Sequence, residues 1–300
     1  MSPHRLPNVL SLKELLPQAE RGRYAVGAFS PRTNAMILPV LRAAQEQRSP
    51  LLVQIAQIEL LWEGNTPETF AAEFFRCLQA EGINVPVGLH LDHTQDMQLI
   101  ERAIAAGFTS VMIDASSLPL EQNIAITRQV VDYAHARGAA VESELGRIAN
   151  NDQMESLDDC ELYTDAEEAG RFVRETGVDA LAVSVGTAHG SYTVRQPKID
   201  YQRLSDIRAH TSVHLVLHGG SGNPAEMIRQ AYRLPGGGVS KINIATDLEL
   251  AALAALGRDR RLTDEEMSAL PAAQLALAQA AVQRTTAEKM SQFLDSSGKA

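Results

Sequence analysis

Apolar runs typical of buried strands alternate along this chain with longer segments in which apolar residues recur every three or four positions. The strand-like runs lie at 24–29, 51–55, 85–91, 110–113, 139–144, 180–185, 213–217 and 239–244. Helical segments between them include 33–47, 68–81, 120–137 and 165–176. This alternation predicts parallel strands that are joined by crossover helices.

The number of strand–helix units predicts an α/β fold, namely a (β/α)₈ TIM barrel with extra C-terminal helices, because eight such units in about 250 residues match that barrel. A doubly wound sheet is the alternative, but the sequence GAFSPR follows the first strand-like run in place of a glycine-rich dinucleotide fingerprint. We expect one domain over residues 1–300, with the barrel at about 20–250 and a helical extension at about 251–300.

Composition narrows the class of protein. Of the 300 residues, 45% are apolar and 21% are charged, as in ordinary globular proteins. The apolar runs are shorter than the ~18 residues of a membrane helix, and the first residues lack the apolar core of a signal peptide. Two cysteines, Cys77 and Cys160, are too few for a disulfide framework. We therefore expect a cytoplasmic protein that does not bind a membrane.

The net charge bears on the partners. Thirty-seven acidic residues against 27 basic ones give −10, which argues against nucleic-acid binding through clustered lysine and arginine. A small anionic substrate remains compatible with this charge, because backbone amides at a helix N-terminus can hold one phosphate.

Histidines follow several of the predicted strands. The segments HLDH, GTAHG and HGGSG lie at 90–93, 186–190 and 218–222, where a barrel places its catalytic loops. Three neutral imidazoles at one rim are typical of a catalytic zinc site with its fourth position open to substrate. Strand alternation does not decide whether His90 or His93 belongs to this set.

Glycine-rich and hydroxyl-bearing segments after the last two strands indicate a phosphate site. HGGSG at 218–222 and NIATD at 243–247 each precede a predicted helix, and barrels often bind phosphate at these two loops. A metal beside a phosphate pocket, with the carboxylate of Asp92 next to a metal ligand, suits proton transfer and bond cleavage next to a ketone.

Taken in order, these segments resemble the class II, zinc-dependent ketose-bisphosphate aldolases that act on fructose or tagatose bisphosphate. The resemblance runs from about Tyr24 to Asp247 and includes HLDH, GFTSVMIDAS, VESELGRI, TGVDALAVSVGTAHG, LVLHGGSG and KINIATDL. It implies a TIM barrel that cleaves a ketose phosphate reversibly to dihydroxyacetone phosphate and an aldehyde, through an enediolate that zinc stabilises.

The resemblance also assigns roles to residues. It implies that His93, His189 and His218 hold one catalytic Zn²⁺, with Glu144 and Asp114 as nearby carboxylates or alternative ligands. Asp92 matches the proton donor to the aldehyde oxygen. The implied phosphate- and ketone-binding residues are Gly190, Gly219, Gly220, Ser221, Asn243, Ile244, Ala245 and Thr246. A monovalent cation, Na⁺ or K⁺, near the carbonyls of Gly190 and Gly219 is a further family feature.

Several positions depart from the family pattern. After ELG the family has Gly-Gly and then a catalytic glutamate, whereas this chain has Asp152 at that place and Glu155 as the nearest substitute. We expect one of these two to handle the C3 proton. Ala56 replaces a small hydroxyl residue that contacts the distal part of the sugar. Arg32 follows the first strand and could meet an anionic group on the aldehyde.

We therefore predict an active aldolase, a lyase that acts on a small phosphorylated sugar and forms a homodimer or homotetramer. One alternative is a non-catalytic, aldolase-like partner subunit, which the altered loop after ELG favours. Another is a different metal-dependent lyase or isomerase on the same barrel. The retained polar residues Asp92, His93, His189, His218 and Asn243 argue against loss of catalysis.

Overall fold

The computed structural model describes residues 6–150, 162–190, 192 and 196–300. Within these residues, eight parallel strands close into a barrel in the order β1-β10-β9-β7-β5-β4-β3-β2, which confirms the predicted TIM barrel. Its strands are β1 (Val26–Phe29), β2 (Leu51–Ala56), β3 (Val87–Thr94), β4 (Ser110–Ile113), β5 (Ala140–Leu145), β7 (Ala180–Val183), β9 (His214–Leu217) and β10 (Val239–Ile244). A separate short pair joins β6 (Ala149–Asn150) to β8 (Ala188–His189).

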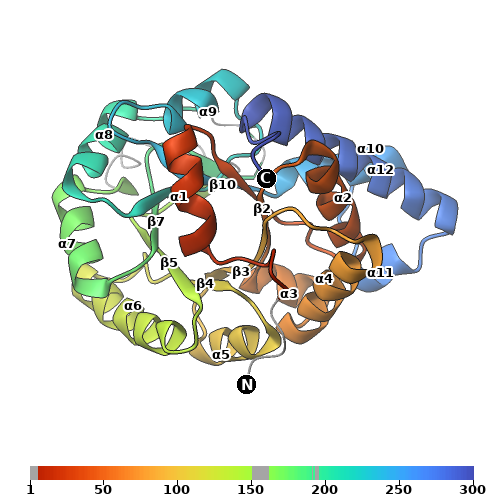
Figure 1. The fold of residues 1–300 in the computed structure, drawn as a ribbon, viewed down its shortest axis with the longest axis horizontal. Helices are drawn as coiled ribbons and strands as arrows, with labels where there is room; N and C mark the ends of the chain where they lie inside the picture. The colour runs from red at the N-terminus through yellow and green to blue at the C-terminus, as the bar shows by residue number, and fades with distance from the viewer. Residues whose placement is uncertain (1–5, 151–161, 191, 193–195) are drawn as a thin grey trace.

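Helices surround the strands (Figure 1). They are α1 (Leu12–Gly22), η1 (Asn34–Met36), α2 (Ile37–Gln47), α3 (Gln57–Glu63), α4 (Pro67–Glu81), α5 (Met97–Ala106), α6 (Leu120–His135), α7 (Ala166–Thr176), α8 (Tyr201–His210), α9 (Ala225–Tyr232), α10 (Thr246–Leu256), α11 (Asp264–Ser268), α12 (Ala272–Glu288) and η3 (Lys289–Phe293). Local signals set their ends: α4 begins after Thr66, whose Oγ1 accepts from Thr69 N at 3.2 Å, and ends before Gly82 at φ 62°.

Helix α1 covers one end of the barrel and lies in front of the strands in Figure 1. Its buried side chains Leu12 and Leu16 pack in one cluster with Val26, Leu52 and Val216, which come from β1, β2 and β9. The chain entering α1 is held by Leu10 N, which donates to Val87 O at 2.7 Å. Because α1 fills the amino end of the barrel, the carboxyl end of the strands remains for the site.

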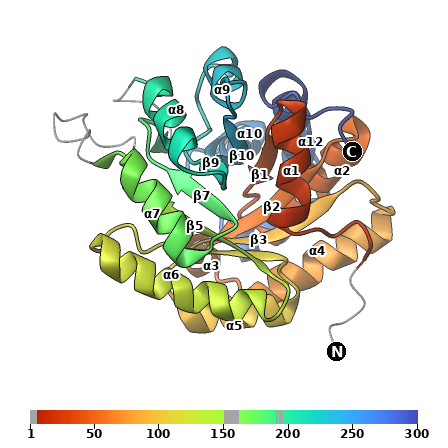
Figure 2. The ribbon, with the colours of Figure 1, turned by 60° about the vertical axis from the view of Figure 1, so that its left-hand side comes forward.

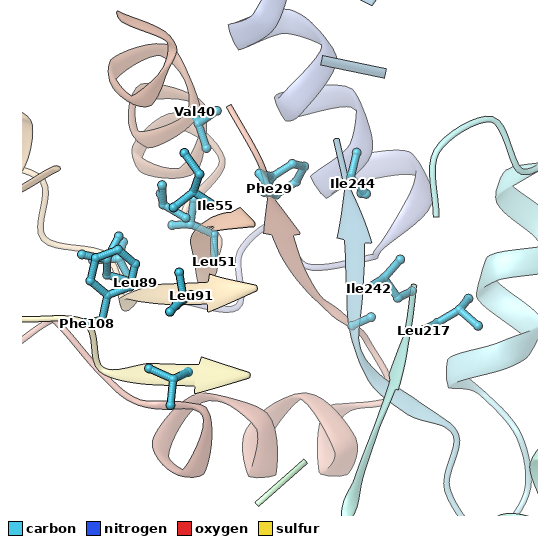
Figure 3. Packing of buried hydrophobic residues seen from close by; sticks show 14 of the residues in the cluster. Phe29, Val40, Leu51, Ile55, Leu89, Leu91, Phe108, Leu217, Ile242 and Ile244 are labelled. Carbon is cyan, nitrogen blue, oxygen red and sulfur yellow. The ribbon is translucent and has the colours of Figure 1, made fainter. Parts of the chain in front are cut away.

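Two kinds of residue alternate along the strands. Ile55, Leu91 and Ile242 belong to the apolar cluster between strands and helices, part of which is drawn in Figure 3. Their neighbours point inward, as the 2.9 Å contact between Lys241 Nζ and Glu142 Oε2 across the barrel demonstrates. The barrel interior therefore carries polar and charged side chains above its apolar, α1-covered end.

The C-terminal helices continue the barrel core. Figures 1 and 2 show α12 beside α2 and α10, and these pairs pack against each other. Met290, Phe293 and Leu294 are buried in the same apolar cluster as the strands. None of the described helices combines the length and apolar character that a bilayer crossing requires.

Candidate active site

Three histidines from three segments converge at the carboxyl end of the barrel. One ring nitrogen from each of His93, His189 and His218 lies within 4.8 Å of the other two. His93 Nε2, His189 Nε2 and His218 Nδ1 are buried and form no hydrogen bond within the described structure. Burying three such nitrogens is unfavourable unless something binds them, and three imidazole nitrogens are a typical donor set for a catalytic metal ion.

The other nitrogens of two rings are held by carboxylates. His93 Nδ1 lies 3.0 Å from Asp114 Oδ2, and His218 Nε2 lies 2.9 Å from Glu142 Oε1. These contacts fix the ring orientations and leave the opposite nitrogens facing the common centre. The histidine cluster is thus prepared for a metal by the residues around it.

A local backbone feature selects His93 over His90. His93 has a φ of 39°, rare for a residue with a side chain, and the pairing of β3 with β4 shifts register between Leu91 and Thr94. This bulge breaks the strand alternation and brings His93 to the cavity. His90 is fully buried beneath it, with Nδ1 2.8 Å from Ser110 Oγ. Of the two histidines between which alternation left the choice open, His93 is the one that groups with His189 and His218.

The two carboxylates expected near the metal lie beside these histidines. Asp114, Glu144 and His93 offer ligand atoms within 4.8 Å of one another, which makes a second group able to hold a metal ion. Glu144 Oε2 also lies 3.4 Å from His218 Nδ1. Ser116 Oγ donates to Asp114 Oδ1 at 2.7 Å and orients that carboxylate.

Asp92 is buried at the end of β3 and accepts hydrogen bonds from two amides. Gln54 Nε2 donates to Asp92 Oδ2 at 3.0 Å, and Asn243 Nδ2 lies 3.2 Å from both carboxylate oxygens. Burial raises the pKa of Asp92, but the positive charges of His93 and Lys241 outweigh this effect, so its pKa falls below the ordinary value. The shift favours the carboxylate form of Asp92, which can accept a proton.

A charged network below the site was not anticipated from the sequence. Lys241 is fully buried, with Nζ 2.9 Å from Glu142 Oε2 and 2.8 Å from Asn243 Oδ1. Burial raises the pKa of Glu142, but the charge of Lys241 and the hydrogen bond with His218 lower it by more. The pKa therefore falls below the ordinary value, and this carboxyl is ionised. The signal was the alternating polar positions of VESEL and SKINI, two strands that are otherwise apolar.

A cavity of about 810 Å³ opens above these groups. Most of the predicted site residues line it: Asp92, His93, Asp114, Glu144, His189, Gly190, Gly219, Ser221, Asn243, Ala245 and Thr246. Two predicted substrate-binding residues are not among its lining residues. Gly220 N donates to Asn243 O at 3.0 Å within the fold, and the Ile244 side chain is fully buried in the apolar core.

The predicted phosphate segments meet at the start of α10. Ser221 Oγ accepts from Ala245 N at 3.3 Å and from Asp247 N at 3.2 Å. These two hydrogen bonds connect the loop after β9 to the segment after β10. The first turn of α10 opens toward the cavity at Thr246. Amides at a helix N-terminus attract an anion, as a phosphate group requires.

Asp152 and Glu155 lie outside the described residues, as does Cys160. The described thiol, Cys77, is buried and free.

Residues 10–299 match the sequence profile of the family described as "Fructose-bisphosphate aldolase class-II". This chain belongs to that family. It is 38% identical over 297 residues to a fructose-bisphosphate aldolase of Geobacillus stearothermophilus, which covers 98% of this chain and 99% of the relative.

Solved structures agree with this membership. The YdjI aldolase from Escherichia coli K12 superposes with a TM-score of 0.80 at 31% identity, over 97% of this chain and 99% of that one. A putative fructose-1,6-biphosphate aldolase from Coccidioides immitis gives a TM-score of 0.80 at 30% identity, over 95% and 96%. The predicted class II aldolase is confirmed, and the enzyme is a lyase of a generally metal-dependent family that acts on phosphorylated sugars.

Proposed function

We propose that this aldolase cleaves a ketose phosphate reversibly to dihydroxyacetone phosphate and an aldehyde, with Zn²⁺ as its catalytic ion. The observation that carries the proposal is the convergence, beside Asp92, of three buried imidazole nitrogens that form no hydrogen bond within the described structure. The phosphate-type segments at Gly190, Ser221 and Thr246 line the same cavity. The relative from Geobacillus stearothermophilus is named for this type of reaction.

The donor set favours zinc among divalent ions, because three imidazoles with an open fourth position are typical of catalytic zinc. When bound, the ion would supply the positive charge that stabilises the enediolate of dihydroxyacetone phosphate. His93, His189 and His218 would hold it, with Asp114 and Glu144 as nearby carboxylates. We also propose a monovalent cation near the carbonyls of Gly190 and Gly219, although Gly219 O already accepts from Asn223 Nδ2 at 2.7 Å.

The chain's own groups would then divide the proton transfers. Asp92 gives a proton to the aldehyde oxygen during condensation and takes it from the C4 hydroxyl during cleavage. Asn243 donates a hydrogen bond to the enediolate oxygen. Asp152 or Glu155 removes the C3 proton, and comparing alanine variants of the two assigns this step. The amides around Ser221 and Thr246 hold the phosphate.

Proton exchange tests the donor half of the reaction without knowledge of the aldehyde. Zinc-loaded enzyme is incubated with dihydroxyacetone phosphate in D₂O, and loss of the C3 proton signal is followed by NMR. We expect exchange that EDTA suppresses. No exchange with zinc bound would contradict the proposal and favour a non-catalytic barrel.

We further propose a single domain that assembles as a homodimer or homotetramer in the cytoplasm. The shared apolar cluster of the strands with Met290 and Phe293 supports the single domain. The free Cys77 thiol suits a reducing compartment. Light scattering of the purified protein tests the oligomeric state.

A further inference from the structure

The cavity has a second half, which is lined by residues that follow β1, by residues in or after β2 and by Arg261. In the barrel order β1 lies between β10 and β2, and β2 lies next to β3, which carries Asp92. The residues that line this half are Ser30, Arg32, Gln54, Ala56, Glu59, Trp62 and Arg261. Because Asp92 is the proposed proton donor to the aldehyde oxygen and β3 pairs with β2, we assign the aldehyde chain to this half and call it the acceptor half.

Both arginines of the acceptor half lie within ion-pair distance of carboxylates, although Arg32 Nε and Nη1 form no hydrogen bond within the described structure. Arg32 Nη1 lies 2.7 Å from Glu249 Oε2, and Arg32 Nε lies 3.2 Å from Glu59 Oε1. Arg261 Nε lies 2.5 Å from Glu249 Oε1, and its guanidinium stacks 4.4 Å from the centre of the Trp62 ring. Glu249 thus bridges the two guanidinium groups.

The charged groups of the acceptor half carry no net positive charge. Two guanidinium groups face the carboxylates of Glu59 and Glu249, and Glu63 lies against the same cluster. Among the described residues that line the cavity, the remaining arginine is Arg147, which follows β5 across the barrel from β1. A phosphate brings nearly two negative charges and is recognised through arginine or lysine that is not already neutralised. Among the described residues, the acceptor half does not provide such a group.

The acceptor half provides uncharged hydrogen-bonding groups. Gln54 is 1% exposed and lines the cavity, and its Oε1 has no hydrogen-bond partner within the described structure. Its Nε2 donates to Ser30 Oγ at 3.1 Å and to Asp92 Oδ2 at 3.0 Å, which fixes the amide so that Oε1 remains free to accept. A buried acceptor of this kind fits a hydroxyl group of a ligand.

We propose that the aldehyde used by this enzyme is an uncharged polyhydroxylated aldehyde, so that its ketose substrate carries one phosphate rather than two. This inference rests on the proposed function. In condensation the C3–H of dihydroxyacetone phosphate loses its proton, a carbon–carbon bond forms to the aldehyde carbon, and the aldehyde oxygen gains a proton. Nothing is oxidised or reduced.

Matched pairs of aldehydes test the proposal. Zinc-loaded enzyme is given dihydroxyacetone phosphate with glyceraldehyde or glyceraldehyde 3-phosphate, and with erythrose or erythrose 4-phosphate. We expect kcat/KM for each uncharged aldehyde to exceed that of its phosphorylated partner at least tenfold. A preference for the phosphorylated aldehydes overturns the proposal. Addition to neither pair, while the C3 proton still exchanges in D₂O, overturns it and leaves the proposed function standing.

A variant tests whether the charge balance is the cause. Glu249→Gln removes the carboxylate that bridges Arg32 and Arg261, and we expect it to shift the kcat/KM ratio at least tenfold toward the phosphorylated aldehydes. Glu121→Gln is the matched control, because Glu121 pairs with Arg171 on the exposed surface. The control should keep the wild-type ratio. An unchanged ratio in Glu249→Gln would overturn the inference that ion pairing excludes the second phosphate.

Discussion

Lys241 Nζ lies 2.8 Å from Asn243 Oδ1, on the side of the amide opposite Asp92. Because an ammonium group only donates, this contact forces the Asn243 carbonyl toward Lys241 and its NH₂ group toward Asp92. The proposed enediolate contact of Asn243 therefore depends on a buried lysine that lines no part of the cavity. Lys241 is a positioning residue, and Glu142 links it to His218.

Removing Lys241 should slow the reaction, although Lys241 is neither a proposed metal ligand nor a residue that lines the cavity. We expect Lys241→Met to lower kcat on the order of 10–100-fold, as loss of supporting contacts usually does. It should also lower the free energy of unfolding by about 3–5 kcal/mol, because Glu142 becomes an unpaired buried charge. Steady-state kinetics and urea unfolding measure the two effects.

A double variant separates positioning from stability. Glu142→Gln/Lys241→Met removes both charges, and the new amide can still accept from His218, so we expect stability to recover. The rate of C3 proton exchange should stay low, since Asn243 has still lost its fixed orientation. Recovery of the wild-type exchange rate in the double variant would mean that Lys241 acts on folding alone.

Loss of one of the proposed metal-binding histidines should remove metal and activity together. We expect His189→Ala to retain far less zinc after dialysis and to lose measurable cleavage, because two imidazoles remain of the three-nitrogen set. Elemental analysis of the purified variant measures the zinc. His135→Ala is the control, because His135 lies at the end of α6 and contacts Asp179 there, away from the histidine cluster. This variant should keep its full zinc content. Full zinc content in the His189 variant would exclude that residue from the metal site.

Asp92 should matter for proton transfer and not for metal binding. We expect Asp92→Ala to keep its zinc and to slow carbon–carbon cleavage by ~10²–10⁴-fold, the usual contribution of a general acid or base. Gln54→Leu removes one of the amides that hold Asp92 and should give a smaller loss in kcat. Cleavage at the wild-type rate in Asp92→Ala would exclude it from the mechanism.

The sequence sufficed for the barrel because the strands carry short, largely apolar runs and several long helices carry a clear period. Two predicted strands, at 110–113 and 239–244, match β4 and β10 residue for residue. The short helix α3 was missed, since seven residues hold less than two full turns of any period.

The site was harder to predict where the backbone departs from ideal geometry. Strand alternation could not choose between His90 and His93, because the bulge and the positive φ of His93 reverse the expected orientation. The ion pair between Arg32 and Glu249 could not be predicted from the sequence either, since Glu249 lies more than two hundred positions further along the chain. Pairings across the barrel follow from topology and not from neighbouring residues.

A buried carboxyl beside the acceptor half should make stability depend on pH. Glu63 is 3% exposed, and neither of its oxygens has a hydrogen-bond partner within the described structure. Burial raises the pKa of Glu63 from 4.5 to about 7, more than the nearby Arg261 and Arg32 lower it. The folded protein thus binds this proton more tightly than the unfolded chain does.

The sign follows from that difference. Stability from the protonated Glu63 is fully present below the unfolded pKa of 4.5 and is lost as pH rises through the folded pKa of about 7. Between pH 5 and pH 8 the wild type should therefore lose up to about 3 kcal/mol more of its unfolding free energy than Glu63→Gln does. Urea unfolding of the zinc-free proteins at both pH values measures this. Glu101→Gln, on the exposed face of α5, should behave as the wild type, and an equal pH dependence in the Glu63 variant would assign the loss to other groups.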